Sequence, residues 1–228
     1  MLHDPCRLTT AHRTEVDRVA ANEATSLDKT APSSPVTRYL LWMDGVGGFL
    51  ICLSERLTLG QHCLDSTADI ALLADVSRQH ASLRRDEEGY SLEAIRPASV
   101  NGQPRQQAML RNGDRVTLGT TCQLQFWQPV PVSKSARLDL VSNHRFAHPV
   151  QAVLLMSDSL VFGPGSQSHV VVSDLKERLI LCRNKNDLEM RWPGEVLVDG
   201  VKHTNKAILE PGATVLFDAF ALALEPVT

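Results

Sequence analysis

Residues 75–83 read DVSRQHASL, a polar run that opens directly into apolar–polar alternation. Within it, Ser77, Arg78 and His80 place a hydroxyl, a guanidinium and an imidazole close together. A loop that merely joins two strands needs none of these groups. The alternation in ASLRR is typical of a β-strand with one buried face. The stretch therefore predicts a strand whose preceding loop holds something with its side chains.

The same strand-like pattern continues on both sides of this stretch. In TCQLQFW at 121–127, Cys122, Leu124 and Phe126 alternate with polar side chains, which predicts another half-buried strand. Such runs are separated by turn sequences, for example DEEG at 86–89. Helical spacing is not evident after the N-terminal region, so the sequence predicts an all-β fold, a β-sandwich.

Length and composition narrow the possible classes of protein. The chain has 228 residues, which favours two domains, since domains usually contain roughly 100 to 150 residues. A net charge of −3 gives no bulk attraction to nucleic acid or acidic membranes. The 5 cysteines form no C-x-x-C pair, which indicates reduced thiols. With no secretory signal and no run of about 18 apolar residues, we expect a cytoplasmic protein without a membrane span.

Composition also divides the chain into parts. Residues 1–36 carry scattered charge, several Thr and Ser and the APSSP run, and they predict a flexible N-terminal tail. The segment QPVPVS at 128–133 interrupts the strand pattern with two prolines and predicts a linker. We therefore expect a first β domain at 37–131 and a second at 132–228.

The two predicted β domains repeat one another. At an offset of roughly 100 residues, Gly60 aligns with Gly163 and the Asn-Gly turn at 101–102 with the Asp-Gly turn at 199–200. The segment NGDRVTLG aligns with PGATVLFD in the same register. The sequence thus predicts two tandem β-sandwiches that arose by duplication.

Four short motifs of the first half resemble those of the forkhead-associated (FHA) domain. They are LTLG at 57–60, DVSRQHASL at 75–83, ASVNGQP at 98–104 and LRNGDRVTLG at 110–119, and their order and spacing also fit. The resemblance implies β-sandwiches of the SMAD/FHA type, whose loops bind phosphothreonine in peptides. It implies an interaction module and not an enzyme, with no cofactor and no metal.

The resemblance assigns phosphate-binding roles to three positions. In the family, an arginine usually follows the glycine of the first motif and binds the phosphate. Here Gln61 occupies that position. Ser77 stands where the family serine donates its hydroxyl to phosphate, and Arg78 supplies a cation beside it. Phosphate is best met by guanidinium, hydroxyl and amide donors on a rigid loop. Because Gln61 is neutral, the site loses one charge-assisted hydrogen bond, worth about 1.5–3 kcal/mol.

Other positions are expected to shape the loops. The resemblance implies that His80 braces its loop from within, together with Gly60 and Gly102. It also implies that Asn101 holds the main chain of the bound peptide.

Two functions stay open at this point. The first is a phosphothreonine-dependent signalling adaptor, weakened by Gln61, whose partner is a phosphothreonine-containing protein such as a Ser/Thr kinase substrate. The second is an assembly scaffold that keeps the fold without reading phosphate, because Ser-x-x-His also stiffens loops and Asn-Gly is a common tight turn. Neither involves nucleic acid or a membrane, and the oligomeric state is left open.

The second half departs further from the family pattern. Pro164 stands at the arginine position, and LKERL at 175–179 replaces VSRQH, so that Glu177 would repel phosphate. We expect this degenerate copy to serve in packing. His144 and His148 have the spacing of a metal-binding pair but lack a further ligand at zinc spacing, so no metal site is predicted.

Overall fold

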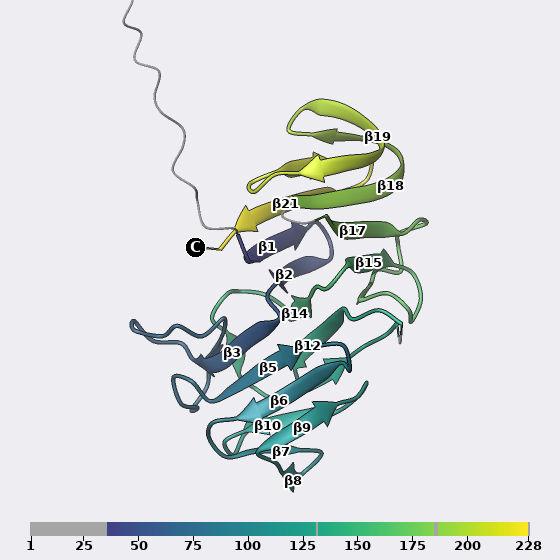
Figure 1. Cartoon of the computed structure of the whole chain (residues 1–228). Helices are drawn as coiled ribbons and strands as arrows, with labels where there is room; N and C mark the ends of the chain where they lie inside the picture. Colours follow the sequence, from purple (N-terminus) through teal and green to yellow (C-terminus); the bar gives the residue numbers. More distant parts are fainter. Residues whose placement is uncertain (1–35, 131, 185–186, 228) are drawn as a thin grey trace, which may run out of the picture. The chain divides into compact units, whose positions relative to one another are not determined.

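β-Strands are the only regular secondary structure among the residues that the structure describes. The structure is a computed structural model that describes residues 36–130, 132–184 and 187–227 (Figure 1). The predicted all-β fold is therefore confirmed. In β11 (Cys122–Trp127), every second side chain is buried, as the alternation in TCQLQFW predicts.

The strands follow one another through turns and loops along the whole described chain. The first half contains β1 (Arg38–Met43), β2 (Gly47–Cys52), β3 (Arg56–Gln61), β4 (Ile70–Leu73), β5 (Ala81–Arg85), β6 (Tyr90–Ala94), β7 (Ala98–Val100), β8 (Gln103–Pro104), β9 (Gln107–Leu110), β10 (Arg115–Leu118) and β11. The second half contains β12 (Ala136–Leu140), β13 (Arg145–Phe146), β14 (Ala152–Leu155), β15 (Ser159–Gly163), β16 (Val170–Val171), β17 (Leu179–Asn184), β18 (Asp187–Val198), β19 (Val201–Leu209), β20 (Thr214–Leu216) and β21 (Ala221–Pro226).

These strands pair into two sheets. The larger sheet has 15 strands in the order β16-β15-β17-β18-β20-β21-β1-β2-β14-β12-β11-β10-β7-β8, with β19 paired to β18. The smaller sheet has 6 strands in the order β13-β4-β3-β5-β6-β9. Figure 1 shows β3, β5, β6 and β9 of the smaller sheet as one layer, with β10 and β7 of the larger sheet beside them.

Buried apolar side chains form two separate cores. The first core lies between the smaller sheet and the β2-β14-β12-β11-β10-β7 part of the larger sheet, and it includes Leu59, Leu83 and Phe126. The second core is enclosed by the rest of the larger sheet, together with β2 and β14, and it includes Phe162 and Leu181.

β2 and β14 pair in parallel and divide their side chains between the two cores. Phe49 and Ile51 of β2 enter the second core. Leu50 and Cys52, which alternate with them, enter the first core. The side chains of β14 alternate between the cores in the same way. Both strands are buried on both faces, which explains why their sequences are continuous apolar runs.

Strands also cross between the two halves of the chain. β12, from the second half, pairs with β11 and places Ala136 and Leu138 in the first core. β1, from the first half, pairs with β21 and places Leu41 and Met43 in the second core. Each core thus contains strands from both sides of the predicted boundary after residue 131. The domain division itself stays a prediction.

The larger sheet folds over the second core within β18. The N-terminal part of β18 pairs with β17, whereas Leu197 and Val198 pair with β20. Between these parts the register with β19 shifts, at the segment from Arg191 to Glu195, which includes Pro193. A proline has no N–H to donate to a neighbouring strand, so it suits such an irregularity.

The N-terminal tail predicted at 1–36 lies outside the described residues except for its last position. In the described part of the chain, no helix is long and apolar enough to cross a membrane. The thiols of Cys52 and Cys122 are free and buried, and burial raises their pKa values to about 12 and about 11. The cytoplasmic location stays a prediction.

Candidate functional site

The loop at 74–80 joins β4 to β5, and its main chain lies directly against β3. Gly60 allows this approach, because a Cβ atom at that position would overlap the carbonyl group of Arg78. The N–H of Gln61 donates a hydrogen bond to the carbonyl oxygen of Ser77 at 3.0 Å. Contacts with β3 therefore fix the main chain that carries Ser77 and Arg78.

The imidazole of His80 lies inside this loop, with 3% of the residue exposed. Nδ1 accepts a hydrogen bond from the N–H of Ser77 at 3.2 Å, so the proton of the neutral ring is on Nε2. Nε2 lies 2.9 Å from the carbonyl oxygen of Pro97 and donates to it. The nitrogen of Gly119 lies 3.0 Å from Nε2, and its N–H donates to the same carbonyl oxygen at 3.0 Å.

The main chain of His80 adds three hydrogen bonds. Its N–H donates to the carbonyl oxygen of Leu59 at 2.8 Å. Its carbonyl oxygen accepts the N–H groups of Ile95 and Arg96 at 2.9 and 3.0 Å. Ring and main chain together connect β3, the 74–80 loop, the 95–97 loop and Gly119, which are otherwise distant in sequence.

Ser77 and Arg78 line one pocket of about 510 Å³, which we call the Ser77–Arg78 pocket. Its other lining residues are Asp65, Thr67, Gln79, Ile95 and Arg96. Gln79 Nε2 donates a hydrogen bond to the Thr67 hydroxyl at 3.2 Å, which joins the 62–69 loop to the 74–80 loop. The structure thus brings together two of the residues expected to bind phosphate.

Three side chains of this pocket carry donor groups without a partner among the described residues. Within the described ranges, the guanidinium groups of Arg78 and Arg96 and the hydroxyl of Ser77 make no hydrogen bond or ion pair. Arg78 and Arg96 are exposed, and Ser77 is half-buried. A pocket with two free guanidinium groups and a hydroxyl can meet an anion that has several acceptor oxygens.

Asn101 lies in a tight turn after β7, and its side-chain amide is hydrogen-bonded within the protein. Its Oδ1 accepts the N–H of Arg115 at 2.9 Å, and its Nδ2 donates to Asp114 Oδ1 at 2.8 Å. It has a φ of 52° and is followed by Gly102 with a φ of 78°, as a tight turn with positive φ requires. Neither Asn101 nor Gln61 is among the residues that line the Ser77–Arg78 pocket.

Arg96 is the pocket residue that sequence reasoning missed. It lies in the loop between β6 and β7, outside all four motifs that resemble the family. The only sequence signal was a cation beside Pro97. Its proximity to Ser77 depends on the hydrogen bonds of His80, which no local pattern reveals.

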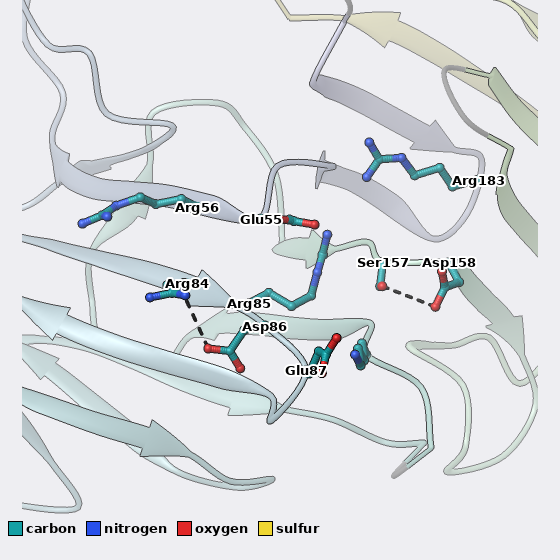
Figure 2. Close-up of a pocket in the computed structure, with 10 residues that line it drawn as sticks. Glu55, Arg56, Arg84, Arg85, Asp86, Glu87, Ser157, Asp158 and Arg183 are labelled. Atoms are coloured by element: carbon teal, nitrogen blue, oxygen red, sulfur yellow. Dashed lines mark hydrogen bonds and ion pairs between the residues drawn. The ribbon is translucent and has the colours of Figure 1, made fainter.

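A larger cleft of about 850 Å³ lies between the two cores, and we call it the junction cleft (Figure 2). The cations that line it are Arg56, Arg84, Arg85, Lys134 and Arg183, and the carboxylates are Glu55, Asp86, Glu87 and Asp158. Figure 2 shows these side chains of both signs interspersed around the opening, with the Arg84–Asp86 pair at 4.0 Å. Four of its five cations are already paired, Arg56 with Glu93, Arg84 with Asp86, and Arg85 and Arg183 with main-chain carbonyl groups, so the junction cleft offers no strong preference for an anion.

Arg85 in this cleft has a structural role. The residue is 7% exposed, and its NH1 group donates to the carbonyl oxygen of Met156 at 2.8 Å. Its NH2 group lies 3.4 Å from the carbonyl oxygen of Leu53, which also accepts from Arg183 NH1 at 2.7 Å. Arginines from both halves thus hold one carbonyl group next to β2.

The second half repeats the turn of Asn101 with a different residue. Asp199 has a φ of 49°, and its Oδ1 accepts the N–H of Thr214 at 2.9 Å. Its N–H donates to the carbonyl oxygen of Thr214 at 2.9 Å, as Asn101 does to Arg115 at 2.8 Å. This shared pattern supports the interpretation of a duplication, which stays a prediction.

No histidine occurs in LKERL at 175–179, and the buried histidine of the second half is His169, before β16, whose Nδ1 accepts the N–H of Val161 at 3.0 Å. Gly163 lies against the main chain of Glu177 and Arg178, as Gly60 lies against the 74–80 loop. Three aromatic rings pack together where β18 meets the loop between β20 and β21. Phe217 and Phe220 stack with centroids 4.1 Å apart, and Trp192 packs on Phe217 at 5.1 Å. No serine or histidine lies in LKERL, so no donor set like that of the first half forms there.

Residues 57–119, from β3 to the end of β10, match the family model of the FHA domain. This part of the chain is an FHA domain, and the resemblance inferred from the four motifs is confirmed for it. FHA domains are in general phosphopeptide-binding interaction modules and not enzymes.

Two solved structures are similar to this chain. The FHA-2 domain of the ABC transporter Rv1747 from Mycobacterium tuberculosis, solved by NMR, is 26% identical, and the match covers 39% of this chain and 76% of that chain with a TM-score of 0.30. The Rv0020c FHA structure is 27% identical, and the match covers 39% of this chain and 91% of that chain with a TM-score of 0.26. A search of curated proteins found no match.

Proposed function

We propose that residues 57–119 recognise phosphothreonine in a partner protein through the Ser77–Arg78 pocket. The observation that supports this most directly is the pairing of an uncommitted hydroxyl and an uncommitted guanidinium in one pocket. His80 holds the loop that carries both groups, so little conformational freedom is lost on binding. The partner is a phosphothreonine-containing protein, such as a Ser/Thr kinase substrate, and the setting is cytoplasmic signalling.

Ser77→Ala and Arg78→Gln test this proposal. Each removes one donor to the phosphate, and a hydrogen bond to a charged group is worth about 1.5–3 kcal/mol, so we expect affinity to fall about ten- to a hundredfold. The measurement is titration of the full chain with a peptide library that contains one fixed phosphothreonine, beside the same library without phosphate. Arg145→Gln is the matched control, because Arg145 is exposed in β13 and lines none of the pockets described above. Equal binding of both libraries would exclude phosphothreonine recognition.

Gln61 and Asn101 keep secondary roles in this proposal. The side chain of Gln61 is neutral and outside the pocket, which weakens binding relative to a family member with arginine there. Asn101, which is expected to hold the peptide main chain, retains one free N–H on Nδ2 after its bond to Asp114. Gly60 and Gly102 act by shaping the loops.

A second function remains, an assembly scaffold that does not depend on phosphate. The observation in its favour is the hydrogen bonding of Asn101, because both polar atoms of its amide already hold the turn at 111–115. In that case Ser77→Ala and Arg78→Gln leave the capture of partner proteins unchanged, whereas substitutions at the partner interface abolish it.

A further inference from the structure

Arg96 shares the Ser77–Arg78 pocket without belonging to any recognised motif. Its guanidinium makes no hydrogen bond or ion pair with the described residues. Its main-chain N–H donates to the carbonyl oxygen of His80 at 3.0 Å. Since the ring of the same histidine accepts the N–H of Ser77, the main chains of Arg96 and Ser77 are held by one residue.

The charges of this pocket come from three residues. Arg78 and Arg96 contribute two guanidinium groups and Asp65 one carboxylate, which gives a net charge of +1. Gln61, at the position where the family has its arginine, contributes none and does not line the pocket. The cation that is missing from the end of β3 is therefore replaced by one from the 95–97 loop.

We propose that Arg96 is the second phosphate-binding arginine of this protein and that it clamps a phosphate together with Arg78 and Ser77. The inference rests on the proposed function of the same pocket and names the residue that takes over from position 61. A guanidinium binds phosphate through two parallel hydrogen bonds. Two such groups and one hydroxyl provide enough donors for the three terminal oxygens of a phosphoester.

The clamp selects for a dianion. Phosphothreonine carries about −1.5 to −2 charges at neutral pH and three acceptor oxygens, whereas an Asp or Glu side chain carries one charge and two oxygens. The carboxylate of Asp65 opposes any anion in the pocket, so a singly charged group gains little. We therefore expect that peptides with Asp or Glu in place of phosphothreonine do not bind. Binding should also weaken as the pH falls through the second pKa of the phosphate, about 6.

The experiment uses the full chain and the tightest peptide from the phosphothreonine library. Arg96→Gln should weaken binding of this peptide about tenfold through loss of a charge-assisted hydrogen bond. Arg96→Lys keeps the positive charge but cannot form the bidentate pair of hydrogen bonds. The affinity of this variant for the peptide should therefore lie between those of the wild type and Arg96→Gln. Asp65→Asn should strengthen binding about two- to fivefold. Arg145→Gln should leave it unchanged.

The possible failures are distinguishable. Phosphate-dependent binding by wild type, with unchanged affinity for Arg96→Gln, overturns the role of Arg96 and leaves the proposed function intact. Equal binding of phosphorylated and plain peptides by wild type overturns both. A readout without peptide is the NMR signal of the Arg96 Nε–H during titration with inorganic phosphate, recorded beside Arg145. A shift of Arg96 and Arg78 alone supports the clamp, and equal shifts of all three contradict it.

Discussion

At the scale of single residues, His80 determines the geometry of the pocket without touching a ligand. Its ring takes the N–H of Ser77 on one side and donates to Pro97 on the other, and its main chain holds Arg96. A side chain that is almost completely buried can do this only if both ring nitrogens are paired. The histidine of the Ser-x-x-His motif is therefore explained by hydrogen bonding between loops.

His80→Ala should reduce the free energy of unfolding by about 2–3 kcal/mol. The substitution leaves the N–H of Ser77 without its acceptor and empties the space between three segments. Urea denaturation of the full chain measures the loss, and phosphopeptide affinity should fall in parallel because Ser77 and Arg96 are no longer held together. His62→Ala is the matched control, since His62 is exposed in the loop after β3. Similar losses for both variants would show that His80 has no special role in bracing the loops.

At the scale of elements, the parallel pair β2 and β14 is the unusual part of the fold. Each strand is buried on both faces and belongs to both cores. Successive side chains of a strand point to opposite faces, so neighbouring residues of β14 pack in different cores. Val153 lies in the first core and Leu154 in the second.

Leu154→Ala and Val153→Ala should both destabilise the protein, but they should disturb different cores. Leu154 is fully buried, and its truncation leaves a cavity that costs about 2–5 kcal/mol. Methyl NMR spectra should show the largest shifts among the methyl groups of the second core for Leu154→Ala and among those of the first core for Val153→Ala. If both variants shift the same set of methyl groups, the division of β14 between two cores is wrong.

At the scale of the whole molecule, the sequence predicted the local features well and the long-range pairing poorly. Alternation at Cys122, Leu124 and Phe126 identified β11, and the four motifs identified the FHA domain. The parallel pairing of β2 with β14 joins residues about a hundred positions apart, and the apolar runs FLIC and AVLL fit many partners equally well. Likewise, the side-chain amide of Asn101 donates its hydrogen bond to Asp114, which lies in a different turn, so a local sequence pattern does not reveal it.

The exchange of strands predicts how fragments behave. A fragment of residues 37–131 lacks β12, β13 and β14, so its core loses Ala136, Leu138, Phe146, Val153 and Leu155. We expect this fragment to lack a cooperative thermal transition by circular dichroism and to bind phosphopeptides at least tenfold more weakly than the full chain, since loss of several core side chains removes most of the stability of a small domain.

Mixing this fragment with residues 132–228 should restore both properties, because the second fragment supplies the missing strands. A cooperative transition and full affinity for residues 37–131 alone would show instead that the first core forms without β12 and β14. That result would establish the first predicted domain as an independent folding unit.

The sharing of β2 and β14 also bears on the predicted duplication. A duplicated domain that no longer binds a ligand is ordinarily dispensable. Truncation or accumulated mutations can then remove it without loss of function. Here β12 and β14 of the second half are interior parts of the first core, so a premature stop codon between residues 131 and 155 should abolish ligand binding by the loops of the first half. Selection on binding by the first half thereby retains these strands of the second half.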